Sequence, residues 1–173
     1  MYFGFSEGGV QGGINDQGLF FDGFATKPLR PVLSEDKALY IGDLTSKVME
    51  ECRTVDEVLA LFNKFNLQFM ENAMFFFGDK YGNSVIIEGD VIIRKEGRFQ
   101  ILTNFYQSTV DPDSITCQRY KNAEKIASGA KNVNKDLVRR LLSDTHQESK
   151  YPTQYSNIYD LRNGLIYVYH FHN

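Results

Sequence analysis

The stretch AMFFFGDKYGNSVIIEGDVIIRK, residues 73–95, decides the fold class. Its apolar runs are separated by the turn sequences KYGN and GD, which predicts antiparallel strands over residues 73–79, 84–90 and 91–95. A fourth strand is predicted over residues 98–105, RFQILTNF, after an EGR turn. The runs FFF and VII are apolar without alternation, so both faces of this sheet are expected to be covered.

Helical patterns lie on both sides of this strand meander. Before it, apolar residues recur at three- and four-residue steps, namely Ile41, Leu44, Val48 and Cys52. Helices are predicted over residues 36–52, 54–65, 114–128 and 134–143, with N-caps at Ser34, Thr54 and Asn134. Helix pairs that alternate with antiparallel strands favour sheets in the middle with helices outside.

Strand pairs are predicted at both ends of the chain. Tyr2–Phe5 and Leu19–Ala25 flank a turn rich in glycine and asparagine, and residues 155–161 and 165–172 flank the turn RNG. The order ββ-αα-ββββ-αα-ββ predicts an α+β fold, a four-layer αββα sandwich of two antiparallel sheets flanked by helix pairs. With 173 residues and no linker or internal repeat, the chain is expected to form a single domain, 1–173.

Composition narrows the classes of function. The net charge is −3 with no basic run, which argues against nucleic-acid binding. No apolar segment reaches the roughly 20 residues that a membrane span needs. Cys52 and Cys117 have no CxxC spacing and are expected to be reduced, packed side chains. No GxSxG, P-loop or complete Rossmann glycine pattern occurs, so no cofactor is expected. No leader is visible, so a cytoplasmic location is the default, and a leader upstream of Met1 would change it to secreted or periplasmic.

Two side-chain clusters have a plainer structural explanation. His170 and His172 lie on one face of a predicted strand and could bind a metal ion. The sequence has one other histidine, His146, so a strand near the chain end is favoured and no metal site is expected. Glu88 and Asp90 flank a turn glycine, where solvation at the turn explains them better than a catalytic acid pair.

Five motifs follow one another along the chain: QGGINDQGLFFDG, FFFGDKYGNSVIIEGD, ILTNFYQ, CQRYKNAEKI and TQYSNIYDLRNGLIYVY. Their order resembles that of N-terminal-nucleophile (Ntn) amidohydrolases, and more narrowly that of the linear amide C–N hydrolases, which include choloylglycine hydrolases and penicillin V acylases. The similarity covers nearly the whole chain. It implies an αββα fold, which agrees with the layers predicted from the residues, and a small-molecule amide substrate without a cofactor.

The chemistry that this resemblance implies needs a cysteine at the N-terminus, whose thiolate attacks the amide carbonyl while its α-amine acts as the base. Here the chain starts with Met1 and Tyr2, and neither Cys52 nor Cys117 has a free α-amine. The expectation is therefore a domain of a cysteine-dependent hydrolase of linear, non-peptide amide bonds that is truncated at the N-terminus. The abrupt ending HFHN predicts trimming at the C-terminus as well. As written, the chain is predicted to have no amidase activity.

The resemblance also implies roles for two catalytic residues. Asn104 in LTNF matches the family asparagine whose side-chain amide helps to bind the tetrahedral oxyanion. An asparagine that ends a strand at a turn is the alternative explanation. Arg119 in CQRY matches a family arginine that steadies the region of the nucleophile, and a solvated helix arginine is the alternative.

Three further residues are predicted to contact substrate. Asn15 and Asp16 lie in the opening turn, which borders the substrate pocket in the family, although turn chemistry alone also explains them. Asp22 is an acid in an apolar strand, so it is expected to have a partner or to face the cleft. A second asparagine that choloylglycine hydrolases usually have just beyond this strand is not present. Phe24 and Ala25 occupy that neighbourhood, which argues against bile-salt specificity.

The alternative function belongs to another class: a non-catalytic Ntn-fold binding or assembly module. Loss of the first strands would leave a sheet edge unpaired, and unpaired edges favour self-association. A homo-oligomer is thus expected under either hypothesis.

Overall fold

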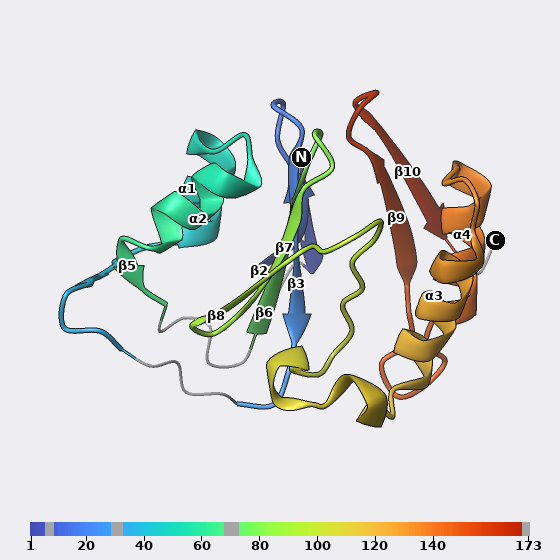
Figure 1. The fold of residues 1–173 in the computed structure, drawn as a ribbon. Helices are drawn as coiled ribbons and strands as arrows, with labels where there is room; N and C mark the ends of the chain where they lie inside the picture. Colours follow the sequence, from blue (N-terminus) through green and yellow to red (C-terminus); the bar gives the residue numbers. More distant parts are fainter. Residues whose placement is uncertain (6–8, 29–32, 68–72, 171–173) are drawn as a thin grey trace. The chain divides into compact units, whose positions relative to one another are not determined.

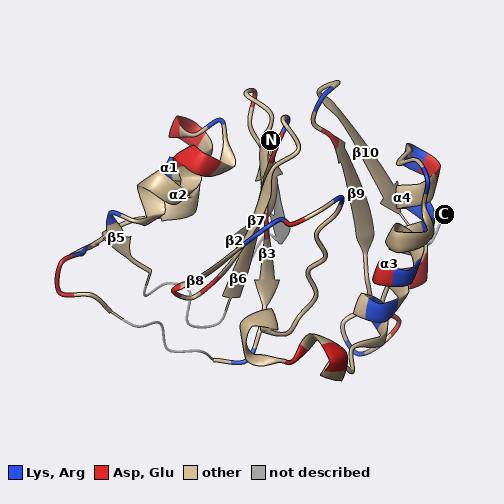
Figure 2. Cartoon of the chain, in the orientation of Figure 1, with Lys and Arg blue, Asp and Glu red and all other residues tan. Residues whose placement is uncertain are grey.

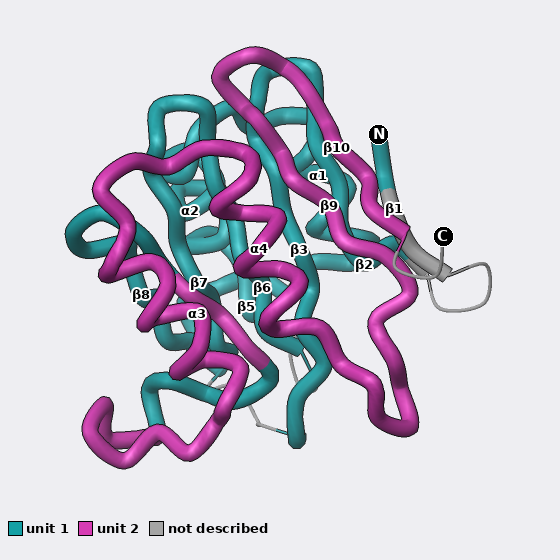
Figure 3. Tube along the Cα trace, turned by 90° about the vertical axis from the view of Figure 1, so that its right-hand side faces the viewer, with its two compact units in different colours: residues 1–100, 104–109 teal, residues 101–103, 110–173 magenta. Residues whose placement is uncertain are grey.

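The computed structural model describes residues 1–5, 9–28, 33–67 and 73–170. The chain divides into two compact units, one of residues 1–100 and 104–109 and the other of residues 101–103 and 110–173 (Figure 3). Each unit contains a sheet and a pair of helices. That the two units together form the single domain 1–173 stays a prediction.

The first unit is built on an antiparallel sheet with the strand order β1-β2-β3-β6-β7-β8 in the described residues (Figure 1). Its strands are β1 (Tyr2–Phe5), β2 (Gly9–Ile14), β3 (Leu19–Ala25), β6 (Ala73–Asp79), β7 (Ser84–Glu88) and β8 (Val91–Arg94). The three strands β6, β7 and β8 confirm the predicted meander, because tight turns between apolar runs leave hairpin pairing as the way to satisfy the backbone.

Strand β2 was not predicted, because its sequence GVQGGI is rich in glycine, which has a low strand propensity. The glycines serve a close approach of backbones instead. A Cβ atom on Gly13 would lie 2.7 Å from the carbonyl oxygen of Met1, and one on Gly12 would lie 3.1 Å from the carbonyl oxygen of Phe21. Because β2 ends at Ile14 and β3 begins at Leu19, the turn that carries Asn15 connects these two strands.

The predicted strand over residues 98–105 is wrong, because this segment forms no strand in the structure. A side chain takes the place of ladder hydrogen bonds there. The Gln100 amide donates from Nε2 to the carbonyl of Ile93 in β8 at 2.8 Å, and its Oε1 accepts from Ser84 Oγ at 2.7 Å. The meander of the first unit consequently ends at β8.

Helix α1 spans Leu44–Glu51, so the predicted start at residue 36 with Ser34 as the cap is wrong. The cap is Asp43, whose Oδ1 accepts from the backbone amides of Thr45 (2.9 Å) and Ser46 (3.2 Å). Gly42 precedes it at φ +130°, a conformation that favours glycine and interrupts any helix.

Two short strands occupy the segments that were predicted to extend the helices. Strand β4 (Ala38–Leu39) pairs in parallel with β5 (Phe65–Asn66). As a result α2 ends earlier than expected and spans Val55–Phe62. Its predicted cap is confirmed, since Thr54 Oγ1 accepts from the backbone amide of Glu57 at 3.2 Å.

The core of the first unit lies between α1, α2 and one face of the sheet. Phe21 and Phe77 are stacked side by side on that face, with ring centroids 6.0 Å apart. Phe62 of α2 meets Phe77 edge-on at 5.6 Å. The fully buried aliphatic residues around these rings include Leu19, Leu44, Val48, Val55, Val58, Val85 and Ile87. Because side chains alternate along a strand, Asp22 and Glu88 belong to the opposite face.

The second unit pairs a β-hairpin with two helices. Strands β9 (Tyr155–Asp160) and β10 (Leu165–His170) are antiparallel and pair without a register shift. Helices α3 and α4 span Gln118–Gly129 and Lys135–Thr145. The α4 cap is confirmed, since Asn134 Oδ1 accepts from the amide of Leu137 at 2.9 Å.

Two predictions in this unit differ in detail from the structure. Helix α3 begins at Gln118 instead of residue 114, because Pro112–Ser114 form a separate 3-10 turn and Cys117 takes the N-cap position. The end of the predicted strand 165–172, with Phe171 and His172, lies outside the described residues.

The fold class is as predicted, with antiparallel sheets and, in the described residues, four α-helices arranged as two pairs along the chain. Charged residues gather on the helices and turns, with acidic and basic ones mixed, whereas the strands are mostly uncharged (Figure 2). None of the helices in the described residues has the length and the hydropathy that a membrane-spanning helix needs.

Candidate functional site

Asn104, the predicted oxyanion ligand, begins a loop over residues 104–109 in the first unit. Its side chain is exposed, and Nδ2 donates to the carbonyl oxygen of Ala25, the last residue of β3, at 2.9 Å. The asparagine amide is therefore attached to one end of the central sheet instead of lying freely in solvent. Such a group is a neutral donor of the kind that stabilises developing negative charge.

The same loop is attached at two further places. The Tyr106 hydroxyl donates to the carbonyl of Lys27 at 2.9 Å and also bonds with the Thr26 hydroxyl. The Glu88 carboxylate accepts from the backbone amide of Gln107 at Oε1 (2.8 Å) and from that of Ser108 at Oε2 (2.9 Å). Three anchors thus determine how the loop lies over the ends of β3 and β7.

Glu88 corrects an expectation, because its side chain is 0% exposed and is not solvated at the turn. It is the last residue of β7, and its strand position directs it to a covered face of the sheet, whereas Asp90 in the turn before β8 is exposed. The sequence contained a signal for this: an acid that ends the apolar run SVII will be desolvated together with its neighbours.

Asp22 lies in the middle of β3, where it pairs with Gly12 on one side and Phe76 on the other. Its carboxyl is largely buried. Burial raises the pKa of Asp22 to about 7, although a backbone hydrogen bond from Gly23 opposes the rise. A Cβ atom on Gly12 would lie 3.2 Å from Asp22 Oδ1, so the glycine leaves the space that the carboxyl fills.

The Asn15 side chain forms four hydrogen bonds to backbone groups. Its Nδ2 donates to the carbonyls of Met49 (3.1 Å) and Cys52 (2.7 Å) at the end of α1. Its Oδ1 accepts from the amides of Gln17 (3.1 Å) and Leu19 (2.9 Å) in its own turn. Both ends of the side-chain amide are therefore used within the first unit.

Asp16, next to Asn15, is exposed, and its Oδ1 accepts from the Gln17 side chain at 3.3 Å. Contact of Asn15, Asp16 or Asp22 with a substrate stays a prediction.

Arg119 belongs to the second unit, where it lies in the first turn of α3. Its positive charge and its backbone amide act on the thiol of Cys117. The Sγ atom of Cys117 also forms a hydrogen bond with the Thr103 hydroxyl at 3.4 Å. Desolvation raises the pKa of the Cys117 thiol, but bonds from Thr103 and from the first helical turn, with the charge of Arg119, lower it overall. Cys52 differs, since burial raises the pKa of its thiol to about 11. Both cysteines are free.

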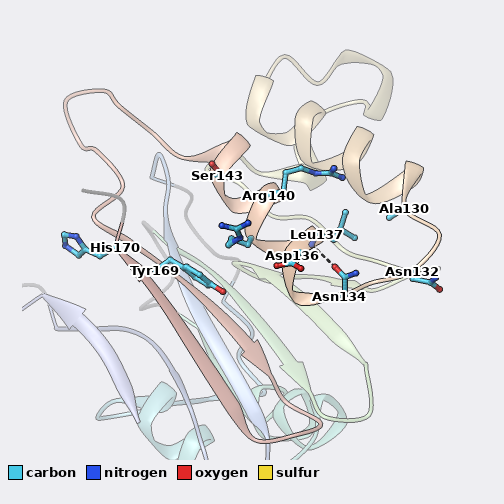
Figure 4. Close-up of a pocket in the computed structure, with 10 residues that line it drawn as sticks. Ala130, Asn132, Asn134, Asp136, Leu137, Arg140, Ser143, Tyr169 and His170 are labelled. Carbon is cyan, nitrogen blue, oxygen red and sulfur yellow. Dashed lines mark hydrogen bonds between the residues drawn. The ribbon is translucent and has the colours of Figure 1, made fainter. Parts of the chain in front are cut away.

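A pocket of about 760 Å³ lies in the second unit, against α4 and β10. Its walls combine polar and apolar surface and include Asp136, Arg140 and Tyr169 (Figure 4). None of the predicted catalytic or substrate-binding residues lines it. In the described part of the chain, no three His, Cys, Asp or Glu side chains are grouped to hold a metal ion, and His172 lies outside that part.

No protein-family model and no curated protein matches the chain. Solved structures do match. Penicillin V acylase from Agrobacterium tumefaciens superposes with a TM-score of 0.67 at 17% identity, over 94% of this chain and 63% of that chain. A mutant of the conjugated bile acid hydrolase from Clostridium perfringens gives 0.66 at 14% identity, over 99% of this chain and 73% of that chain. Another variant of that hydrolase gives 0.65 at 13% identity over the same shares.

The chain thus spans 63% of the length of the penicillin V acylase. With sequence identities between 13% and 17%, these comparisons show similarity of fold alone. In fold, the predicted resemblance is confirmed. The chain has the N-terminal-nucleophile hydrolase fold that penicillin V acylase and conjugated bile acid hydrolase share.

Proposed function

We propose that the chain is a domain of a cysteine-dependent hydrolase of linear carbon–nitrogen bonds other than peptide bonds. The observation that carries the proposal is the position of Asn104: a side-chain amide donor held at the end of β3 by the carbonyl of Ala25. The fold is also that of two amide hydrolases. Fold alone does not determine activity, so the site residues have to bear the proposal.

The roles follow from the chemistry of amide cleavage. An N-terminal cysteine encoded before residue 1 supplies the thiolate and the basic α-amine. Asn104 donates to the oxyanion of the tetrahedral intermediate, and Arg119 orients the site. Asn15, Asp16 and Asp22 belong to the region that receives the small-molecule amide. Residues 1–173 do not include such an N-terminal cysteine, and we expect them not to cleave amides by themselves.

The first experiment reads the genomic DNA in frame upstream of the Met1 codon and then compares two proteins. Residues 1–173 are expected to leave both penicillin V and a conjugated bile acid intact. The upstream-extended form, with its N-terminal cysteine exposed, is expected to cleave a linear amide and to lose all activity when that cysteine becomes alanine. An in-frame stop codon just before Met1, or an active 1–173 chain, would contradict the proposal and favour the non-catalytic module.

Within the extended form, Asn104→Ala is expected to lower kcat about a hundredfold, because one donor to the oxyanion is lost in the transition state. KM should change little, since the oxyanion is absent from the bound ground state. Steady-state kinetics measure both constants. Asn132→Ala is a suitable control, because Asn132 is an exposed asparagine of the second unit. Equal kcat values for the two variants would remove Asn104 from the mechanism.

A further inference from the structure

We infer that Glu88 is a positioning residue: its buried carboxylate holds the loop of residues 104–109 so that the Asn104 amide stays at the end of β3. The functional meaning of this inference rests on the proposed amide hydrolysis. The structural part, that Glu88 determines where the Asn104 side chain lies, can be tested without any activity.

The burial of Glu88 needs compensation. A carboxylate that is 0% exposed has lost its hydration, and this is costly unless hydrogen bonds or an opposite charge replace the water. Among the described residues Glu88 forms no ion pair. Its compensation comes from the backbone amides of Gln107 and Ser108, one to each oxygen. Bonds from amides to a carboxylate are among the stronger ones in proteins, so the loop is firmly held.

The strand register shows why this anchor reaches Asn104. Ala25 at the end of β3 pairs with Ala73 at the start of β6, and the next residue, Met74, pairs with Glu88 at the end of β7. The loop therefore runs from β3 across β6 to β7 at one end of the sheet. The Asn104 side chain is bound at the β3 side of this path, and the Glu88 carboxylate binds the loop at the β7 side. Loss of the Glu88 hydrogen bonds is therefore expected to increase the mobility of the segment that carries Asn104.

Among the similar side chains glutamate, glutamine and aspartate, only glutamate has both the two acceptor oxygens and the length that this geometry needs. Glutamine has the same shape, but its NH2 group would face one of the two backbone amides, donor against donor. Aspartate keeps the charge, yet it is one methylene shorter and cannot reach as far. Both substitutions thus disturb the loop without changing the strand β7 itself.

The test uses the isotopically labelled 1–173 chain and NMR. In Glu88→Gln, the amides of Gln107 and Ser108 are expected to exchange with solvent about tenfold faster, and the side-chain NH2 signals of Asn104 are expected to shift. Asp90→Asn is the matched control, because it makes the same change of charge at an exposed position two residues away. It should leave these signals in place. If Glu88→Gln does not fold, Glu88→Asp is measured in the same way. A folded variant with unmoved Asn104 signals overturns the inference.

Activity then separates this inference from the proposed function. In the extended form, Glu88→Gln is expected to lower kcat about tenfold with little change in KM, as loss of alignment in the transition state does. An extended form that cleaves no amide would defeat the proposed function, while the NMR result on Glu88 would stand. An active form whose kcat is unaffected, although the Asn104 signals move, would overturn the positioning role.

Discussion

Asp22→Asn is expected to raise the free energy of unfolding at pH 8 by about 4 kcal/mol. Burial lifts the pKa of Asp22 from 3.8 to about 7, so the folded state holds its proton more tightly than the unfolded chain does. Each of the roughly three units of pKa corresponds to about 1.4 kcal/mol. Above pH 7 the ionised carboxylate is therefore a full penalty to folding, and asparagine removes it while keeping the shape.

The pH dependence has a definite sign. Below about pH 4 the Asp22 carboxyl is protonated in both states and costs nothing, so the wild-type protein is most stable there with respect to this group. The penalty grows as the pH rises through the window from 3.8 to about 7. Urea unfolding of wild type and Asp22→Asn at several pH values should give curves that meet near pH 4 and separate toward pH 8.

Asp16→Asn provides the control for this experiment, because Asp16 is exposed in the neighbouring turn and loses the same charge. It should follow the wild-type curve within a few tenths of a kcal/mol. If Asp22→Asn and Asp16→Asn show the same stability at pH 8, then the carboxyl of Asp22 is not desolvated in the folded protein.

Asn15→Ala is expected to lower the free energy of unfolding by about 4 kcal/mol, since four hydrogen bonds of about 1 kcal/mol each disappear together. Two of them hold the carbonyls of Met49 and Cys52, and two close the turn before β3. The substitution therefore separates α1 from the β2–β3 turn. Chemical denaturation measures the loss.

Gln17→Ala, at an exposed position of the same turn, is the comparison variant and should be nearly neutral. Hydrogen exchange adds a local measurement. In Asn15→Ala, the backbone amide of Cys52, which donates to Val48 at 2.8 Å, should lose protection before the central strands do. A loss of less than 1 kcal/mol would show that water replaces the Asn15 amide without difficulty.

The parts of the fold that could be predicted from the sequence are those with local signals. Strands β6, β7 and β8 combine apolar runs with turn glycines, and the caps at Thr54 and Asn134 act over three residues. Strand β2 could not be predicted in this way, because its glycines make sense only when the backbones beside them are known. The start of α1 was misplaced because the parallel pairing of β4 with β5 joins segments far apart in sequence.

In the candidate site, too, residues within sequence motifs could be identified from the sequence, whereas properties that depend on tertiary structure could not. Asn104 and Arg119 were identified from motifs, and the structure gives Asn104 a defined partner in Ala25. The role of Glu88 depends on which face of β7 is covered and on where a loop 20 residues later returns, as its bond with Ser108 shows. The perturbed acidity of Asp22 likewise comes from burial in the folded chain, which residue type alone does not report.

The pairing of β3 with β6 has a consequence for how the first unit assembles. These strands are joined by residues 26–72, which contain both α1 and α2, yet they pair residue by residue from Leu19↔Asp79 to Ala25↔Ala73. The hairpins β6–β7 and β7–β8 close short loops and can form early, whereas β3 must return across a long one. Closure entropy rises slowly with length, by about 0.6 kcal/mol for each doubling. Insertions between β3 and β6 are consequently expected to change the free energy of folding only slightly. They are expected to slow folding instead, because they increase the sequence separation of two paired strands.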